Sequence, residues 1–320
     1  YKDQLEPLYK KITAAIRQVD KKHMITLAGT DWGNDWSVFS KPFDDNVFYQ
    51  FHYYCWDKTD NLRSISEYLV KRDNFNVPVW VGEFGEQGNA IYWGTTQYFE
   101  KNNIGWSFWP WKKMDANNAP YSVKKPRGWD AIIDYSKGKA KPSKEQAQKA
   151  FDELIENIKL ENCVYFADVV NAIFHRVPGK VEAENYGHEG AGKSYFVKDT
   201  GLKSNYYRVS EPVPVELIDG ESKGRRSEQY IKLYADEWAA YKVHNLKAQE
   251  YAAVVRAKAE NTPASFVFSV NGQTQDIVIT KSGWNDINLK SLKFKEGDSD
   301  IKLLVGSGTV YFDWMDIKAQ

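Results

Sequence analysis

The sequence predicts an α/β domain built on a parallel sheet, followed by an all-β sandwich. In the first half, short apolar runs alternate with segments whose apolar residues recur at helical spacing, a pattern typical of parallel strands covered by helices. Beyond residue 178 the apolar residues alternate, and turn signals such as Asn271-Gly272 separate short segments. We place the domains at residues 1–176 and 177–320, since 320 residues leave room for two domains.

The first domain is expected to contain four strands and four helices. Ser143 and Gln146 form a capping box that predicts the start of the last of these helices. The expected strands are residues 24–28, 47–53, 78–82 and 104–109, and the expected helices are residues 5–19, 62–69, 91–102 and 143–158.

The second domain is expected to contain short strands and no helix. Its clearest alternating segments are residues 230–234, 251–257, 264–270 and 301–305.

Composition limits the kinds of partner. The formal net charge is zero, and neither a basic run nor a membrane-length apolar stretch occurs, which argues against nucleic acid and membrane partners. Aromatic residues make up 15% of the chain, and Trp in loops beside strands is typical of proteins that bind the flat faces of sugars. Cys55 and Cys163 are either buried thiols or one bridge.

Unusual residues follow the predicted parallel strands, at the edge where chemistry sits in parallel barrels. Glu83 ends the third strand, and His52 and Tyr54 end the second. A Glu there can attack an anomeric carbon while a Tyr holds its carboxylate. The alternative is structural, because such a Glu is commonly a salt-bridge partner and such a His a core residue. Glu86 is expected to be a solvated loop residue.

Tryptophans stand at two of the four strand ends. Trp109 and Trp111 follow the fourth strand, and Trp32 follows the first. A Trp at these positions can form the floor or wall of a sugar subsite, although Trp32 and Trp111 could equally be packing residues.

At these residues the chain resembles glycoside hydrolase family 5, whose members are retaining (β/α)8 TIM-barrel enzymes acting on β-linked glycans. The resemblance covers residues 5–174 and matches the fifth to eighth barrel strands, so it implies the C-terminal half of a barrel. His52-x-Tyr54 matches the sixth strand, Val81-Gly82-Glu83-Phe84-Gly85 the seventh, and Gly105-Trp106-Ser107-Phe108-Trp109 the eighth. It implies that Glu83 is the nucleophile, that Trp109 lies under the sugar, and that catalysis needs no cofactor.

The family's general acid/base is not found in the sequence. It lies in an Asn-Glu-Pro motif, which this chain lacks; Glu6-Pro7 follows Leu5 in a predicted helix. The chain begins at Tyr1, so either its N-terminus was processed or a segment is missing upstream. We expect the N-terminal half of the barrel to be missing, and the chain to be inactive by itself.

Carboxylates mark both ends of the second domain. Glu182 and Glu184 are expected on one face of its first strand, and Asp313 near the end of its last. Three such oxygen ligands suit Ca²⁺, and the alternative is an exposed acidic face.

Residues 181–317 are similar to carbohydrate-binding module family 6, which shares the Glu-x-Glu-x-Tyr opening, the Gly283-Trp284 turn and the Asp-Trp ending. The resemblance implies a structural Ca²⁺ at Glu182, Glu184 and Asp313, and a sugar platform at Trp284. Tyr311 stands where the family has Asn, and the family's second aromatic falls among Tyr230, Lys232 and Tyr234. Either the cleft binds a different glycan end or binding has moved to the concave sheet face.

The sequence therefore predicts a secreted, retaining glycoside hydrolase that acts on a β-linked plant or microbial polysaccharide, truncated before its general acid/base and joined to a carbohydrate-binding module. A polysaccharide or oligosaccharide is the expected partner. The alternative is a carbohydrate-binding protein without catalytic activity.

Overall fold

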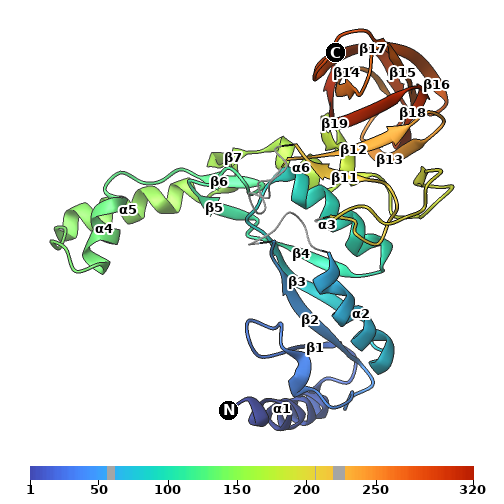
Figure 1. Ribbon diagram of the computed structural model, residues 1–320. Coiled ribbons are helices and arrows are strands. Elements are labelled where there is room, and N and C mark those ends of the chain that lie inside the picture. Colours follow the sequence, from blue (N-terminus) through green and yellow to red (C-terminus); the bar gives the residue numbers. More distant parts are fainter. Residues whose placement is uncertain (56–61, 206, 219–227) are drawn as a thin grey trace.

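The computed structural model describes residues 1–55, 62–205, 207–218 and 228–320. A parallel sheet with its helices lies at the N-terminal end, a β-sandwich lies at the C-terminal end, and a narrow arm extends from the region between them (Figure 1). None of the described helices is both long and apolar enough to cross a membrane.

The first domain is half of a parallel barrel, as predicted. Its strands hydrogen-bond in the order β1-β2-β3-β4, and every pair is parallel. The strands are β1 (Ile25–Ala28), β2 (Val47–Tyr53), β3 (Val79–Gly85) and β4 (Gly105–Trp109), and the helices are α1 (Leu5–Val19), α2 (Arg63–Phe75) and α3 (Asn89–Lys101). A buried aromatic and aliphatic core that includes Trp36, Tyr49 and Phe51 holds the sheet to its helices.

The last predicted helix of the first domain lies in the arm and not on the barrel sheet, contrary to expectation. The predicted capping box is present, because Ser143 Oγ accepts from Gln146 N and Gln146 Oε1 accepts from Ser143 N. The helix that it starts, α5 (Lys144–Asn157), is not the last helix and does not cover the sheet. It lies in the arm with α4 (Trp129–Ser136), β5 (Lys112–Met114), β6 (Tyr121–Val123) and β7 (Val164–Tyr165). A further helix, α6 (Ala167–Ile173), packs on α3 instead.

The second domain is a sandwich of two largely antiparallel sheets, as predicted. One sheet has the order β10-β13-β18-β15-β16, with β8 added beside β13. The other has the order β11-β12-β19-β14-β17, with β9 added beside β19. The strands are β8 (Arg176–Val177), β9 (Gly179–Glu182), β10 (Tyr195–Phe196), β11 (Val215–Leu217), β12 (Gln229–Tyr234), β13 (Trp238–Asn245), β14 (Gln249–Ala259), β15 (Ala264–Val270), β16 (Gln273–Ile279), β17 (Asn285–Phe294), β18 (Gly297–Ser307) and β19 (Thr309–Ala319).

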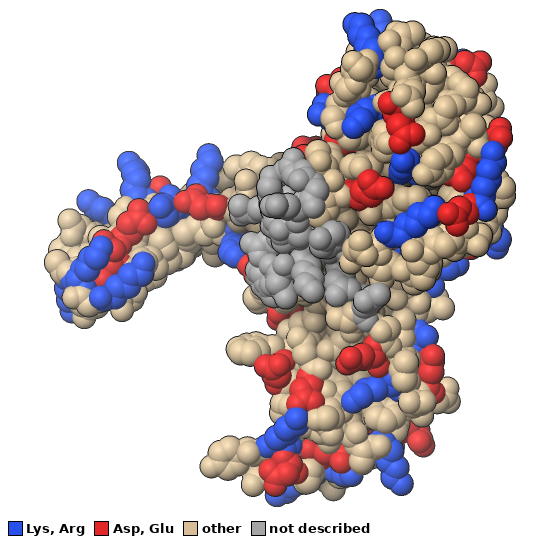
Figure 2. Space-filling view, viewed as in Figure 1, with Lys and Arg blue, Asp and Glu red and all other residues tan. Residues whose placement is uncertain are grey.

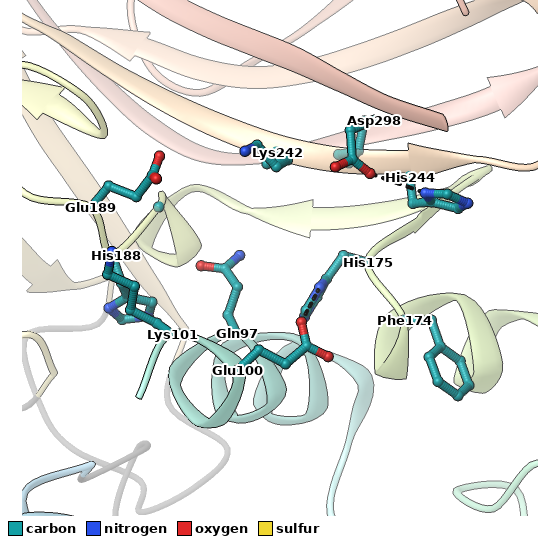
Figure 3. Close-up of a pocket in the computed structure, with 12 residues that line it drawn as sticks. Gln97, Glu100, Lys101, Phe174, His175, His188, Glu189, Lys242, His244 and Asp298 are labelled. Atoms are coloured by element: carbon teal, nitrogen blue, oxygen red, sulfur yellow. Dashed lines mark hydrogen bonds and ion pairs between the residues drawn. The ribbon is translucent and has the colours of Figure 1, made fainter. Parts of the chain in front are cut away.

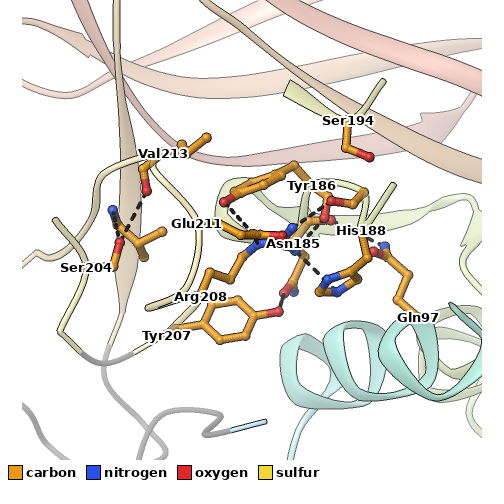
Figure 4. A network of polar contacts seen from close by, with 12 residues as sticks. Gln97, Asn185, Tyr186, His188, Ser194, Ser204, Tyr207, Arg208, Glu211 and Val213 are labelled. Carbon is orange, nitrogen blue, oxygen red and sulfur yellow. Dashed lines mark hydrogen bonds and ion pairs between the residues drawn. The ribbon is translucent and has the colours of Figure 1, made fainter. Parts of the chain in front are cut away.

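The two domains are packed together by apolar and polar contacts. Trp93 of α3 is 1% exposed and belongs to the core of the sandwich. Arg208 is buried and donates to the carbonyls of Tyr186 and Gly187, both at 2.6 Å, in the polar network of Figure 4. In the same network Tyr207 donates to Asn185, which in turn donates to the Ala90 carbonyl at the start of α3. The sandwich is thus tied to the helix that follows β3.

Charge and cysteine chemistry add few constraints. Acidic and basic side chains are interspersed over the face shown in Figure 2, as expected for a chain with zero net charge. Cys55 is buried and Cys163 is partly exposed, and no disulfide joins them, so the alternative of a bridge is wrong.

Candidate active site and sugar-binding face

Three of the predicted site residues meet on one carboxylate. Tyr54 donates its hydroxyl to Glu83 Oε2 at 2.9 Å, and His52 Nδ1 lies 3.4 Å from the same oxygen. The Glu83 side chain is 30% exposed, so it is reachable from solvent while its neighbours hold it. Burial, and then the hydrogen bond to Glu83, raise the pKa of Tyr54 well above its usual value, so the hydroxyl remains a donor.

Register shifts in the sheet create this arrangement. The pairing of β2 with β3 shifts between Phe51 and His52, which places His52 directly opposite Glu83. The pairing of β3 with β4 shifts between Val81 and Phe84. Such irregularities re-aim side chains at strand ends. Gly85 follows with a φ of +146°, and a Cβ there would lie 2.1 Å from the Trp109 carbonyl oxygen, so this position requires glycine.

Residues that the sequence did not single out support the site. Asn34 Oδ1 accepts from the His52 backbone N–H at 2.8 Å, and Tyr68 donates to the Asn34 carbonyl. Glu86 is not a solvated loop residue: its side chain is 22% exposed and forms an ion pair with Lys113. Glu86 has a left-handed φ of +57°, which no residue pattern predicted.

The three predicted tryptophans of the first domain lie in different parts of the fold. Trp109 ends β4, pairs with Gly85 in the sheet, and is 48% exposed. Trp111 is 46% exposed and lies 6.4 Å from the Tyr121 ring in the arm. Trp32 is 83% exposed in the turn after β1. Only Trp109 is therefore placed beside β3 by strand pairing.

The three carboxylates of the sandwich are neighbours, but not in the expected way. Glu182 ends β9 and lies opposite Trp314 of β19, next to Asp313. Glu184 does not lie on that strand; it lies in the 3-10 turn of residues 183–185, because the strand ends at Glu182. No group of three or more His, Cys, Asp or Glu in the described ranges is arranged to hold a metal.

Cationic partners and burial determine the pKa values and pairing of these carboxylates. Lys180 lies 2.9 Å from Glu182, and Arg256 Nε lies 3.0 Å from Asp313. Glu184 Oε2 is buried without a hydrogen-bond partner among the described residues. Burial, and then the charge of Glu182, raise the pKa of Glu184 well above its usual value and that of Asp313 to about 7. Three negative charges on these buried carboxylates are unfavourable unless a further cation binds there.

Trp284 belongs to an aromatic cluster on one face of the sandwich. Its ring lies 5.8 Å from Tyr230, which lies 5.3 Å from Tyr311. Tyr230 is thus the aromatic neighbour of Trp284 among the three candidates. Lys258 Nζ lies 5.0 Å from the Tyr311 ring, and Glu260 accepts from the Tyr311 hydroxyl at 2.7 Å. Rings bordered by donors and acceptors are suited to stack on a sugar and bind its hydroxyls.

A cavity of about 430 Å³ lies between α3 and the sandwich (Figure 3). His175 and Glu100 line its barrel side, and Lys242, His244 and Asp298 line its sandwich side. None of these was predicted as a site residue, and opposite charges share the lining.

The family model described as "Cellulase (glycosyl hydrolase family 5)" matches residues 2–115, which is less than half of the chain. No curated protein matches.

Similar solved structures correspond to parts of the chain. A ruminal GH26 endo-β-1,4-mannanase is 18% identical, with a TM-score of 0.30; the match covers 46% of this chain and 27% of that chain. A carbohydrate-binding module from Cellvibrio mixtus lichenase 5A, in complex with cellotriose, is 14% identical, with a TM-score of 0.31; the match covers 45% of this chain and 98% of that chain. Thermotoga maritima Cel5A with cellobiose is 17% identical, with a TM-score of 0.33; the match covers 38% of this chain and 50% of that chain. These likenesses are too distant to carry an inference about substrate.

Proposed function

We propose that the chain is the C-terminal part of a secreted, retaining glycoside hydrolase that acts on a β-linked polysaccharide, with an appended carbohydrate-binding module. The observation that carries this proposal is the single carboxylate of Glu83, held by Tyr54 at 2.9 Å with His52 3.4 Å away. The match of residues 2–115 to a glycosyl hydrolase model supports it.

Glu83 is the nucleophile in this proposal. It attacks the anomeric carbon as the glycosidic bond breaks and the general acid gives its proton to the departing oxygen. Water, deprotonated by the same group, then hydrolyses the covalent glycosyl intermediate and frees Glu83. Tyr54 and His52 hold the attacking oxygen in place, and Trp109 stacks under the sugar. Retention requires a second carboxyl group about 5–5.5 Å away, as general acid and base. We assign that role to a Glu of the N-terminal half of the barrel.

The experiment supplies that half. A polypeptide carrying the first four barrel strands, with Asn-Glu-Pro, is mixed with the chain, and reducing-sugar release from β-glucan, mannan and xylan is measured. Glu83→Gln should abolish the restored activity, whereas Glu67→Gln, an exposed carboxylate of α2, should leave it unchanged. Full activity of Glu83→Gln would overturn the assignment. Absence of activity with every complement would favour the alternative of a non-catalytic carbohydrate-binding protein.

The sandwich binds sugar at Trp284, Tyr230 and Tyr311 in this proposal. It also holds a structural Ca²⁺ through Glu182, Glu184 and Asp313, whose hard oxygen atoms are the ligand type that Ca²⁺ prefers. The buried, unpartnered Oε2 of Glu184 supports this assignment. The ion would offset the negative charge of the cluster and tie β9 and the turn after it to β19.

A further inference from the structure

A second cavity, of about 620 Å³, lies between the active-site edge of the barrel and the first strand of the sandwich. It is bordered by Glu86 and Gln87 from the loop after β3, by the first turn of α3, by Asn117 and Asn118 from the arm, and by Glu182 from β9. We propose that this interdomain cavity is a binding subsite for an uncharged saccharide, an inference that rests on the proposed function.

The cavity adjoins the candidate active site. Glu86 follows Glu83 by three residues, and its charge is among those that raise the pKa of Tyr54, after burial and the bond to Glu83. Glu86 thus borders the cavity and also lies within electrostatic range of Tyr54, the residue that holds Glu83. The volume falls within the range of about 300–1,000 Å³ that is typical of ligand sites.

The lining favours a polyhydroxylated ligand. Four side-chain amides, those of Gln87, Asn89, Asn117 and Asn118, border the cavity, and Ala90 and Ile91 are its apolar residues. An amide both donates and accepts hydrogen bonds, and a carboxylate accepts them, so the set matches hydroxyl groups that do both. The N-terminal turn of α3 has no side-chain cap, which leaves backbone donors at the same place.

The charges favour a neutral ligand over an ion. Each carboxylate at the cavity already has an ammonium partner: Glu86 pairs with Lys113, and Glu182 pairs with Lys180 at 2.9 Å. Among the described residues that line the cavity, none is a Lys or Arg that could attract an anion. Glu86 is the carboxylate that the proposed Ca²⁺ site does not use, and a free cation would have to displace Lys113 from it.

The walls of the cavity are held in place before any ligand binds. The buried Tyr92 hydroxyl accepts from the Gln87 backbone N–H at 2.9 Å and donates to the Asn118 carbonyl at 2.8 Å, which joins the two loops. The bond from Asn185 to the Ala90 carbonyl holds the sandwich against α3. Within the described part of the chain, both amide atoms of Gln87 are buried without a partner. A bound hydroxyl would satisfy them.

The test uses the full chain and isothermal titration with cellohexaose, mannohexaose and xylohexaose. Trp284→Ala removes the proposed platform on the sandwich, and Asn89→Ala with Asn117→Ala removes two exposed amides from the cavity. At least one hexasaccharide should still bind Trp284→Ala. Adding the two Asn substitutions should weaken that binding about tenfold, the effect of two lost hydrogen bonds. Asn74→Ala, on the exposed face of α2, is the matched control, and unchanged melting curves verify folding.

The outcomes separate this inference from the proposed function. If Trp284→Ala abolishes all binding, the subsite is refuted while the sugar-binding role of the sandwich stands. If Trp284→Ala still binds and the added Asn substitutions have no effect, the subsite is refuted and the remaining binding lies elsewhere. If only the Asn substitutions weaken binding, the subsite stands and Trp284 is not a platform. Failure of the unsubstituted chain to bind any hexasaccharide refutes both. Binding of Ca²⁺ that the Asn substitutions remove would mark a cation site and also refute the subsite.

Discussion

At the scale of single residues, the Tyr54 hydroxyl is the group that holds the Glu83 carboxylate most directly. Its bond to a carboxylate is charge-assisted, and such bonds contribute about 1.5–3 kcal/mol. Tyr54→Phe should therefore lower the activity of the complemented enzyme by about 10- to 100-fold, mainly in kcat, because the bond holds the attacking atom. Tyr135→Phe, an exposed tyrosine of the arm, should have no effect. Equal activity of both variants would show that Tyr54 does not position the nucleophile.

His175 predicts a pH dependence at the seam between the domains. Burial lowers its pKa to about 4, and its Nε2 lies 2.7 Å from Thr96 Oγ1 and 3.2 Å from the Trp93 carbonyl. Between about pH 4 and its unfolded value of about 6.5, the folded chain binds fewer protons than the unfolded chain. Stability should therefore fall as pH drops through this window.

Melting curves of the chain and of His175→Gln, recorded from pH 7.5 to pH 4.5, measure this effect. As pH falls, the Tm of the unsubstituted chain should decrease relative to the Tm of His175→Gln. Contributions from other titrating groups cancel in that comparison. A difference that is constant over this range would rule out His175 as the titrating group.

The residue types at the strand ends were predictable, but the residues that support them from other segments were not. Glu83, His52 and Tyr54 could be recognised because each follows an apolar run that ends at one edge of a parallel sheet. Asn34 and Lys113 could not, since their roles depend on backbone turns and on an arm whose position no local pattern encodes. Glu86 was misread as solvated for the same reason.

At the scale of elements, the short β9 strand and the turn after it determine how Ca²⁺ could bind to the three carboxylates. Because Glu184 lies in the turn and Arg256 holds Asp313, Ca²⁺ must compete with an internal cation. At a free concentration 100-fold above its dissociation constant, Ca²⁺ should stabilise the folded chain by about 2.7 kcal/mol. Melting with calcium and with chelator measures this, and Glu184→Gln should abolish the difference. Identical curves for the unsubstituted chain would mean that Lys180 and Arg256 neutralise the cluster alone.

Arg256 also connects that cluster to the sugar-binding face. Its guanidinium bonds Asp313 and Asp286 and lies 5.6 Å from the Trp284 ring. Strand spacing in the sequence does not show that one long side chain bridges the carboxylates and Trp284. A change at Asp313 therefore reaches Trp284 through one side chain.

Element types and bounds followed closely from periodicity, and their assembly did not. The strands at residues 47–53 and 264–270 were predicted with their observed bounds, and α5 started at its predicted cap. The capping box specifies where a helix starts but not what it packs against, so α5 was assigned to the barrel although it lies in the arm. α6 is only seven residues long and was too short for its periodicity to be read.

At the scale of the whole molecule, the two domains depend on each other unequally. The sandwich has its own core and two sheets, whereas the half barrel exposes the edges of β1 and β4. Trp93 adds to this asymmetry, because it leaves α3 to pack in the sandwich core and would be uncovered if the domains were separated.

We therefore expect residues 1–176 alone to be insoluble or self-associated, and residues 177–320 alone to fold. Exposed strand edges pair with other chains, and the uncovered Trp93 adds an apolar surface. Sedimentation and thermal melting of the two pieces test this. Trp93→Gln should reduce, but not remove, the self-association of 1–176, because the strand edges remain. A soluble monomer of unsubstituted 1–176 that melts cooperatively would show that half a parallel barrel can stand without either its other half or the sandwich.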